Sequence, residues 1–167
     1  GQGVARDFQK AAKWFRKAAD QGRDKAQYNL GLMYNHSEGV GQDQEKAAQW
    51  YHKAADQGNA SAQCNLGLMY EYGEGVPQDL KKAAQWYHKA ADQGNASAQY
   101  NLGLMYKNGE GVAQDLQEAV QWFRRAADQG DFSAQFYLGS MYYKGEGFCQ
   151  DYKKALHWLR KAADQGF

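Results

Sequence analysis

The sequence predicts an all-α fold in which antiparallel helix pairs stack into a solenoid, and three observations lead to this prediction. A glycine followed by valine or phenylalanine recurs at a constant step of 36 residues, at Gly3, Gly39, Gly75, Gly111 and Gly147. Each repeat holds two helical patterns of apolar residues, and no alternating strand pattern occurs. A repeat of this length is typical of helical-hairpin solenoids, so we expect about nine helices.

The repeat makes the whole chain, 1–167, a single array. Its units are 3–38, 39–74, 75–110 and 111–146, followed by a partial unit at 147–167. Because the array begins within a repeat and ends without a polar capping helix, we expect a fragment of a longer protein or an engineered array. Uncapped stacking faces also predict end-to-end self-association. The compartment stays open: a bacterial cytoplasmic, periplasmic or secreted location is compatible with the sequence.

The first helix of a repeat is clearest at residues 79–94, DLKKAAQWYHKAADQG. Its apolar residues recur three and four positions apart, as they do on one face of a helix. Asp79 stands at the N-cap, and Gly94 stands just beyond the helix end, where glycine is favoured. The equivalent segment at the start of the chain predicts a helix at about residues 7–20.

The second helix of a repeat is predicted at residues 95–109, with Asn95 as its N-cap and Gly109 after its end. The connecting loops of about two and about six residues predict antiparallel neighbours. A glycine stands in the middle of this helix in each full repeat, at Gly31, Gly67, Gly103 and Gly139. Since glycine there costs about 1 kcal/mol relative to alanine, we expect a neighbouring helix to approach closely.

Three motifs in the repeats carry a family resemblance. They are Ala-x-x-x-Leu-Gly-x-x-Tyr, Gly-x-Gly-Val-x-x-Asp and Lys-Ala-x-x-Trp-Tyr-x-Lys-Ala-Ala. They resemble the Sel1-like repeat, a relative of the tetratricopeptide repeat, over essentially the whole chain. The resemblance implies a right-handed superhelical α-solenoid that acts as an adaptor or scaffold for protein complexes, often in bacteria. In the family frame the Asn-Leu-Gly helix is helix A and the Trp-Tyr helix is helix B, so a lone helix B precedes four A–B pairs.

Some positions depart from the repeat pattern. Ser37 stands where the other repeats have glycine, and because a left-handed serine is strained, this turn is expected to differ. Tyr137 replaces an asparagine of the other repeats. The paired cysteines of the cysteine-rich subfamily are absent, so the β-lactam binding or hydrolysis linked to that subfamily is only a remote alternative. Cys64 and Cys149 lie more than two repeats apart, so no intrachain disulfide is expected.

In related helical-repeat folds the A helices line a concave groove, and the resemblance places a peptide or protein partner there. The candidate contact residues are the positions of helix A that packing does not need: Tyr28, Asn29, Leu32, Asn35, Cys64, Asn65, Leu68, Glu71, Tyr100, Asn101, Leu104, Lys107, Phe136, Tyr137, Ser140 and Tyr143. Three recurring asparagines, Asn29, Asn65 and Asn101, either bind an extended peptide backbone or satisfy backbone groups of adjacent turns. The neighbouring aromatic residues can anchor apolar side chains.

Helix B carries a basic stripe. It consists of Arg16, His52, His88, Arg124 and Arg160, flanked by Lys17, Lys53, Lys89, Arg125 and Lys161. We interpret this stripe as a solvated face, since cations are favoured near helix C-termini. The aspartates that follow, Asp20, Asp56, Asp92, Asp128 and Asp164, lie at the unfavourable helix end, so we expect them to bond a neighbouring unit.

The composition argues against several functions. The 20 Lys and Arg residues nearly balance the 19 Asp and Glu residues, so nucleic acid is not an expected partner. No stretch approaches about 18 apolar residues, so no membrane insertion is expected. There is no His-x-x-x-His or Cys-x-x-Cys motif, no phosphate loop and no nucleophile–base grouping. We therefore expect no metal, no cofactor and no enzymatic activity.

Two functional hypotheses remain. The first is a non-enzymatic scaffold or adaptor that binds a peptide or partner protein in the groove of the A helices. The alternative is a structural or assembly element that makes its contacts through the solenoid ends or the convex face.

Overall fold

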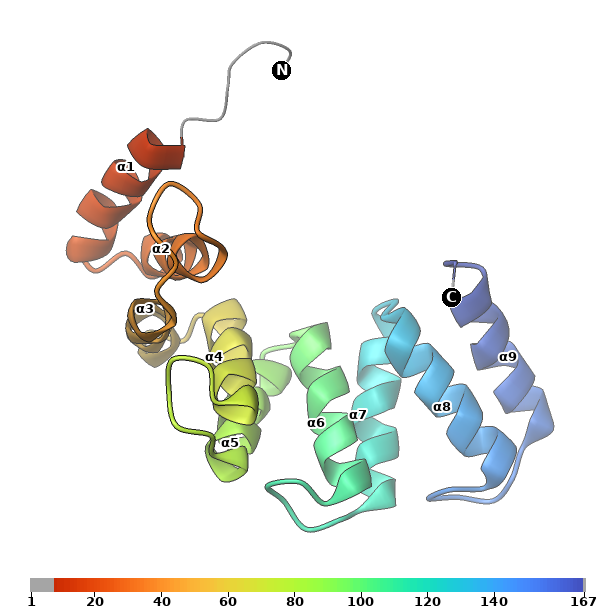
Figure 1. The fold of residues 1–167 in the computed structure, drawn as a ribbon. Helices are drawn as coiled ribbons and strands as arrows, with labels where there is room; N and C mark the ends of the chain where they lie inside the picture. Colours follow the sequence, from red (N-terminus) through yellow and green to blue (C-terminus); the bar gives the residue numbers. More distant parts are fainter. Residues whose placement is uncertain (1–7, 167) are drawn as a thin grey trace. The chain divides into compact units, whose positions relative to one another are not determined.

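The computed structural model describes residues 8–166, and this part of the chain is helical throughout, with nine helices and no strand (Figure 1). The helices are α1 Phe8–Asp20, α2 Asp24–His36, α3 Gln44–Asp56, α4 Ala60–Tyr72, α5 Leu80–Asp92, α6 Ala96–Asn108, α7 Leu116–Asp128, α8 Phe132–Lys144 and α9 Tyr152–Ala163. Odd-numbered helices are helix B of the family frame and even-numbered helices are helix A. The predicted helix at about 7–20 is observed from Phe8, while Asp7 lies outside the described residues.

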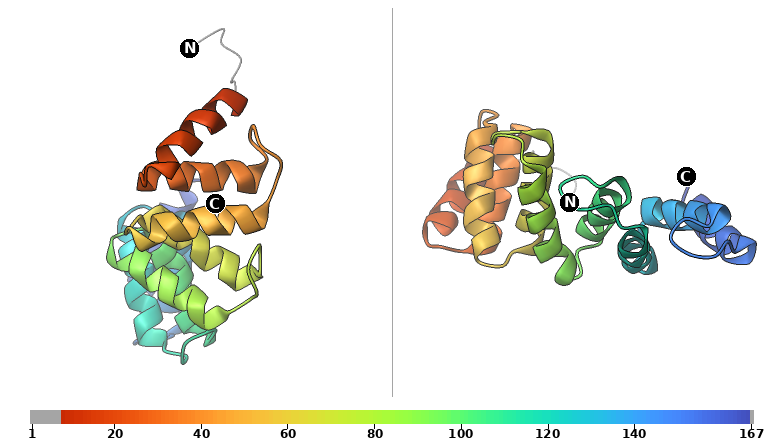
Figure 2. Two further views of the ribbon diagram at one scale, coloured as in Figure 1. Left: turned by 90° about the vertical axis from the view of Figure 1, so that its left-hand side faces the viewer. Right: turned by 90° about the horizontal axis from the view of Figure 1, so that it is seen from below.

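The chain divides into two compact units, Gly1–Asp79 and Leu80–Phe167. The first unit contains α1 to α4 and the second contains α5 to α9. Within each unit, consecutive helices run antiparallel and pack side by side (Figure 2). The predicted all-α arrangement of antiparallel helix pairs is therefore confirmed.

The helices begin and end where the capping pattern predicts. The Asn95 side chain accepts a hydrogen bond from the Ala98 backbone N–H at 2.9 Å, and Asp115 caps α7 in the same way. The helix predicted at residues 95–109 is observed as α6, which is shorter only by the two capping residues. The helix predicted at residues 79–94 is observed as α5, which ends at Asp92 because a short turn precedes the left-handed Gly94.

The expectation that the turn at Ser37 differs is wrong. Ser37 adopts φ 61° and ψ 35°, close to the 73° and 33° of Gly73 in the next repeat. Both residues donate their backbone N–H to the carbonyl of a methionine four residues earlier. The Ser37 hydroxyl also donates to the Val40 carbonyl at 3.4 Å, a local bond that partly offsets the strain. The repeated architecture therefore imposes the turn on serine as well.

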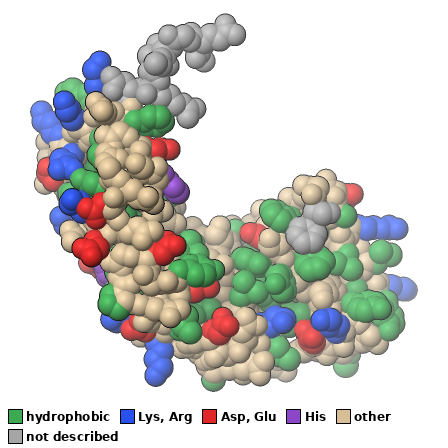
Figure 3. Space-filling model, viewed as in Figure 1, with side chains coloured by type: hydrophobic (Ala, Val, Ile, Leu, Met, Phe, Trp, Pro, Cys, Tyr) green, Lys and Arg blue, Asp and Glu red, His purple; other side chains and the backbone are tan. Residues whose placement is uncertain are grey.

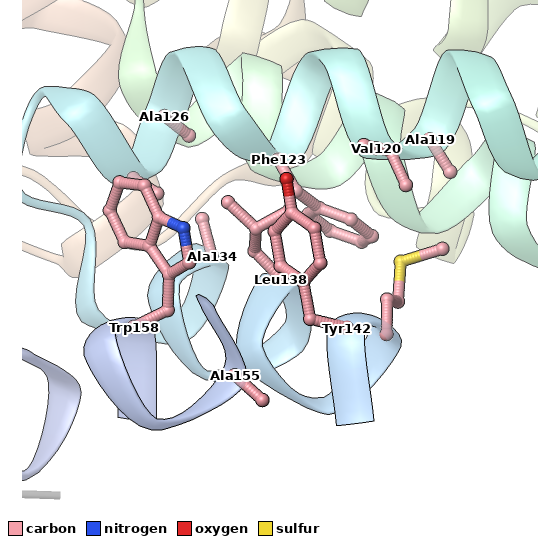
Figure 4. Packing of buried hydrophobic residues seen from close by; sticks show 11 residues of the cluster. Ala119, Val120, Phe123, Ala126, Ala134, Leu138, Tyr142, Ala155 and Trp158 are labelled. Atoms are coloured by element: carbon pink, nitrogen blue, oxygen red, sulfur yellow. The ribbon is translucent and has the colours of Figure 1, made fainter. Parts of the chain in front are cut away.

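Alanines and a few large side chains form the core of the second unit (Figure 4). Phe123 on α7 and Leu138 on α8 are fully buried, and Trp158 on α9 closes the same cluster. Ala119, Ala126 and Ala134 lie between them without exposed surface. Small side chains at these positions let the helix axes approach, so the large residues fill the space that remains.

The glycines in the middle of the A helices lie against large side chains of helix B. A Cβ atom added at Gly31 would lie 2.6 Å from the Tyr51 ring, and one at Gly103 would lie 2.7 Å from the Phe123 ring. Contacts this short do not occur between real Cβ atoms and their neighbours. The predicted close approach of a neighbouring helix is confirmed at these positions.

Replacing Gly103 with alanine should destabilise the chain by about 1–2 kcal/mol. Helix propensity favours alanine by about 1 kcal/mol, but overpacking costs about 1–3 kcal/mol. The Phe123 ring has little room to yield because it stacks on Tyr137 at 5.3 Å between ring centroids. Urea unfolding followed by circular dichroism measures the change. The control is Gly41→Ala, where an added Cβ has no atom within 4 Å; a stabilised Gly103→Ala variant would contradict the argument.

A chain of glutamine side chains joins successive helices. The buried Gln99 on α6 donates to the Ala91 carbonyl of α5 at 3.0 Å and accepts a hydrogen bond from Gln129, after α7, at 2.7 Å. The same pattern occurs at Gln27, Gln57 and Ala19 in the first unit. The aspartates that were expected to bond a neighbouring unit are all exposed. They are Asp20, Asp56, Asp92, Asp128 and Asp164. The glutamines that follow three of them, Gln57, Gln129 and Gln165, make the contact instead.

The arginines and lysines of the basic stripe are exposed, as its interpretation as a solvated face predicts, while His52 and His88 are half-buried. His52 and His88 exchange hydrogen bonds with the hydroxyls of Tyr70 and Tyr106, at 3.1 and 3.0 Å, and Arg16 donates to Tyr34 in the same way. The lysines beside them lie over tryptophan rings, as Lys53 does at 4.1 Å from the Trp50 centroid. The bonds to the tyrosine hydroxyls join consecutive helices, whereas Lys53 and Trp50 pair within α3.

Candidate functional site

The predicted contact residues lie on α2 and α4 in the first unit and on α6 and α8 in the second. Most are half-buried, while Phe136 and Tyr143 on α8 are 36% and 58% exposed. Hydrophobic side chains reach the surface over α6 and α8 (Figure 3). Cys64 departs from the expectation: only 4% of it is exposed, so it offers no surface to a partner.

The asparagines at equivalent positions have different environments. The Asn29 side chain donates to the Lys25 carbonyl of its own helix at 2.8 Å, which is the structural alternative that the sequence left open. The Asn65 amide instead lies close to the hydroxyls of Tyr28 and Tyr51. Burial raises the pKa of both hydroxyls, and the interaction with this amide lowers it by a smaller amount. The two residues therefore cannot be treated as equal members of one ladder.

A pocket of about 270 Å³ opens between α2, α3 and α4 in the first unit. Five of its lining residues are predicted contact residues: Tyr28, Leu32, Asn35, Asn65 and Leu68. The other four were not predicted: His36, Tyr51, Met69 and Glu74. The pocket thus combines apolar side chains with two amides, one imidazole and one carboxylate. This mixture is typical of sites that take a ligand group with an apolar body and a polar end.

Tyr51 on α3 is the deeply buried member of this pocket. It is 1% exposed, and its hydroxyl makes no hydrogen bond of normal geometry, although the Asn65 amide lies close to it. Burial raises the pKa of this hydroxyl well above its usual value, with a smaller opposite effect of the nearby Asn65 amide. The Tyr28 ring lies 5.9 Å away, centroid to centroid. A buried hydroxyl without a well-formed hydrogen bond costs free energy, and such a group is often retained where a ligand completes its bonding.

The local electrostatics around α4 are negative. Burial, and to a smaller extent the charge of Glu71, raises the pKa of the Cys64 thiol to about 11. Glu74, at the pocket, is an exposed carboxylate, and no lysine or arginine lines this pocket. The thiol therefore stays protonated near neutral pH, and the pocket favours a cationic over an anionic group.

The repeat at 111–146, in the second unit, has a different filling at the equivalent position. Phe123 replaces Tyr51 there, and Tyr137 replaces Asn65. The two rings stack at 5.3 Å with an interplanar angle of 11°, and Tyr100 lies within 6.0 Å of both. The aromatic ring of Tyr137 thus occupies space beside helix B that the smaller Asn65 leaves open in the first unit.

Sequence reasoning missed Tyr51, His36, Met69 and Glu74 as pocket residues. Tyr51 lies on helix B, outside the A helices to which the prediction was restricted, and its ring packs against Gly31. Glu74 follows the end of α4, outside the helix to which the prediction was restricted.

Other kinds of site were sought in residues 8–166. No group of three or more His, Cys, Asp or Glu side chains in this range is placed to hold a metal ion. Cys64 and Cys149 are free thiols. No described helix has the length and hydropathy that a membrane crossing requires.

Comparison with known proteins supplies the family. The sequence model of the Sel1 repeat matches residues 1–22, 24–59, 60–95, 96–131 and 132–167. The chain is similar to a protective antigen of uropathogenic Escherichia coli strains displaying an SLR fold, with 44% identity and a TM-score of 0.91 over 93% of this chain and 33% of that chain. No curated protein matches the chain significantly.

Two further solved structures are similar to this chain. A Sel1 repeat protein from Oxalobacter formigenes has 39% identity and a TM-score of 0.91, over 98% of this chain and 65% of that chain. Helicobacter pylori cysteine rich protein B has 28% identity and a TM-score of 0.62, over 80% and 96%. The chain thus spans about a third of the antigen and 65% of the Oxalobacter protein. Since matched repeats cover nearly every residue and these neighbours share the α-solenoid fold, the chain belongs to the Sel1 repeat family, within the tetratricopeptide-repeat-like superfamily.

Proposed function

We propose that this chain is a non-catalytic interaction module that binds an extended peptide segment of a partner protein along its A helices. Sel1 repeat proteins are generally protein-interaction scaffolds. The observation that carries the proposal for this chain is the pocket between α2, α3 and α4, where five predicted contact residues meet a buried hydroxyl that makes no hydrogen bond of normal geometry. In the second unit, the half-buried side chains of α6 and α8 form a separate candidate contact surface.

The proposed binding mode has a physical basis. The Asn65 amide can both donate to and accept from a peptide backbone, while the neighbouring pocket takes one side chain of the peptide. Leu32 and Leu68 are half-buried, so covering them with a ligand removes further apolar surface from water. Binding by a largely preformed surface limits the entropy lost on association.

The test uses random peptides selected for binding to the 167-residue chain. Affinities of the selected peptides are then compared between the chain and its Asn65→Tyr variant by fluorescence anisotropy. We expect at least about a tenfold loss, because a tyrosine at this position fills space as Tyr137 does in the second unit. Thermal unfolding checks that the variant folds.

The matched control is Lys53→Gln, on the exposed side of α3 over the Trp50 ring. This variant should bind the peptides normally. If Lys53→Gln abolished binding while Asn65→Tyr left it unchanged, the peptides would bind the outer face of the B helices and the proposal would be wrong.

The alternative, assembly through exposed helix faces, has one observation in its favour. Trp14 on α1 is 69% exposed, whereas the equivalent Trp122 on α7 is 6% exposed. Light scattering over a concentration series separates the two functions. A mass that rises with concentration and returns to the monomer value in Trp14→Ser supports self-association, and a constant monomer mass counts against it.

A further inference from the structure

The pocket between α2, α3 and α4 is small. Its volume of about 270 Å³ lies below the roughly 300–1,000 Å³ typical of pockets for drug-sized ligands. An inference about its occupant rests on the proposed peptide-binding function and makes it more specific. The question is which side chain of a bound peptide the lining residues would select.

The walls of the pocket fit a long apolar stem. Leu32, Leu68 and Met69 supply aliphatic and thioether surface, and the Tyr28 and Tyr51 rings stand 5.9 Å apart beside them. Methylene groups gain from burial against such walls, and the aromatic faces attract a cation. This protein uses the same pairing elsewhere, since Lys53 lies 4.1 Å from the centroid of Trp50.

The polar groups of the pocket suit a hydrogen-bond donor with positive charge. Glu74 contributes a carboxylate and His36 an imidazole, and neither a lysine nor an arginine lines the pocket. No ion pair of Glu74 occurs among the described residues. The Tyr51 hydroxyl, buried among these residues, has an oxygen that can accept a hydrogen bond of normal geometry, which it does not receive within the chain. A carboxylate on the ligand would instead meet the like charge of Glu74.

We infer that this pocket is a specificity site for one lysine or arginine side chain of the bound peptide, whose methylenes pack on Leu32 and Leu68 and whose cationic end pairs with Glu74 and Tyr51. The repeat at 111–146 does not carry this chemistry, because Phe123 has no hydroxyl and Tyr137 stands in place of the asparagine. The repeat at 75–110 keeps the tyrosine and the asparagine, as Tyr87 and Asn101.

The experiment is a random-peptide selection on the 167-residue chain, with peptides that also bind the Asn65→Tyr variant removed. The expected result is a set of peptides that share a lysine or arginine at one fixed position. In the tightest peptide, replacing a shared lysine by norleucine keeps the stem and removes the charge. A shared arginine is replaced by citrulline for the same purpose. This change should weaken binding about tenfold.

Two variants of the chain connect this preference to the proposed residues. Glu74→Gln removes the charge but keeps the size, so the advantage of the basic peptide over its neutral analogue should fall to about twofold or less. Tyr51→Phe keeps the ring that packs on Gly31 and removes only the hydroxyl, as at Phe123. It should fold normally and bind the basic peptide several-fold more weakly.

Each outcome decides the question. A fixed aromatic, aliphatic or acidic residue, or an unchanged preference in Glu74→Gln, overturns the specificity inference and leaves the proposed peptide-binding function standing. If no selected peptide needs the open pocket, both the inference and the proposed site are wrong. A shared basic residue whose advantage depends on Glu74 supports both.

Discussion

Replacing Gly111 with alanine is expected to destabilise the chain by about 3–5 kcal/mol, at the upper end for single substitutions. Gly111 has φ +71°, and an added Cβ would lie 2.2 Å from the Leu80 carbonyl oxygen at the start of α5. Backbone atoms cannot move away as a side-chain end can. The variant therefore combines the strain of a left-handed alanine with a clash that separates α5 from the loop before α7.

The matched control for this prediction is Gly130→Ala. Gly130 has φ +94°, but no atom lies within 4 Å of an added Cβ, so only the conformational cost of about 1–2 kcal/mol remains. Urea unfolding followed by circular dichroism gives both values, provided that the dependence on urea is unchanged. Equal losses in the two variants would show that the close approach to Leu80 contributes nothing, contrary to the structure.

Replacing Gln99 with alanine should cost about 2–3 kcal/mol. The variant loses the bond to the Ala91 carbonyl at 3.0 Å and the bond from Gln129 at 2.7 Å, and it leaves a small cavity among buried residues. Because these bonds join α5, α6 and the end of α7, we expect hydrogen exchange to accelerate at all three helices.

Gln129→Ala serves as the comparison for Gln99. It removes the outer bond and a long bond to the Arg125 carbonyl at 3.5 Å, both at an exposed position, and should cost less than about 1 kcal/mol. The double variant should lose little more than Gln99→Ala, since the two residues share one interaction. A Gln129→Ala variant as unstable as Gln99→Ala would show that the buried bond to Ala91 is not the main contribution.

Most of the fold could be predicted from the sequence because its signals are local and repeated. Caps such as Asn95 and the left-handed Gly94 depend on residues close in the chain, so they mark helix ends without knowledge of the neighbours. The mid-helix Gly103 showed that another helix must come close, and the structure identifies Phe123 as the contact. Ser37 is the exception, because packing of the repeat overrides its own conformational preference.

The candidate site could be predicted only in outline. The sequence assigned Tyr28, Leu32 and Asn65 to an open face of the A helices, and all three line the pocket. It also assigned Cys64 to that face, but an exposed thiol and a buried one look the same in a helical pattern. Whether the side chain at position 65 fills the space beside helix B depends on its size and on the side chains that pack around it. A single sequence does not show which side chains those are.

By itself the sequence determined the repeat, the helix pairs, the helix ends and the need for close helix contacts. Each of these follows from spacing along the chain and from the conformational limits of single residues. The tertiary structure alone decided which side chains meet across helices: Gln129 with Gln99, His52 with Tyr70, and Tyr51 with the pocket. These contacts depend on the distance and rotation between packed helices, so only the assembled helices bring a buried hydroxyl and a carboxylate to the same pocket.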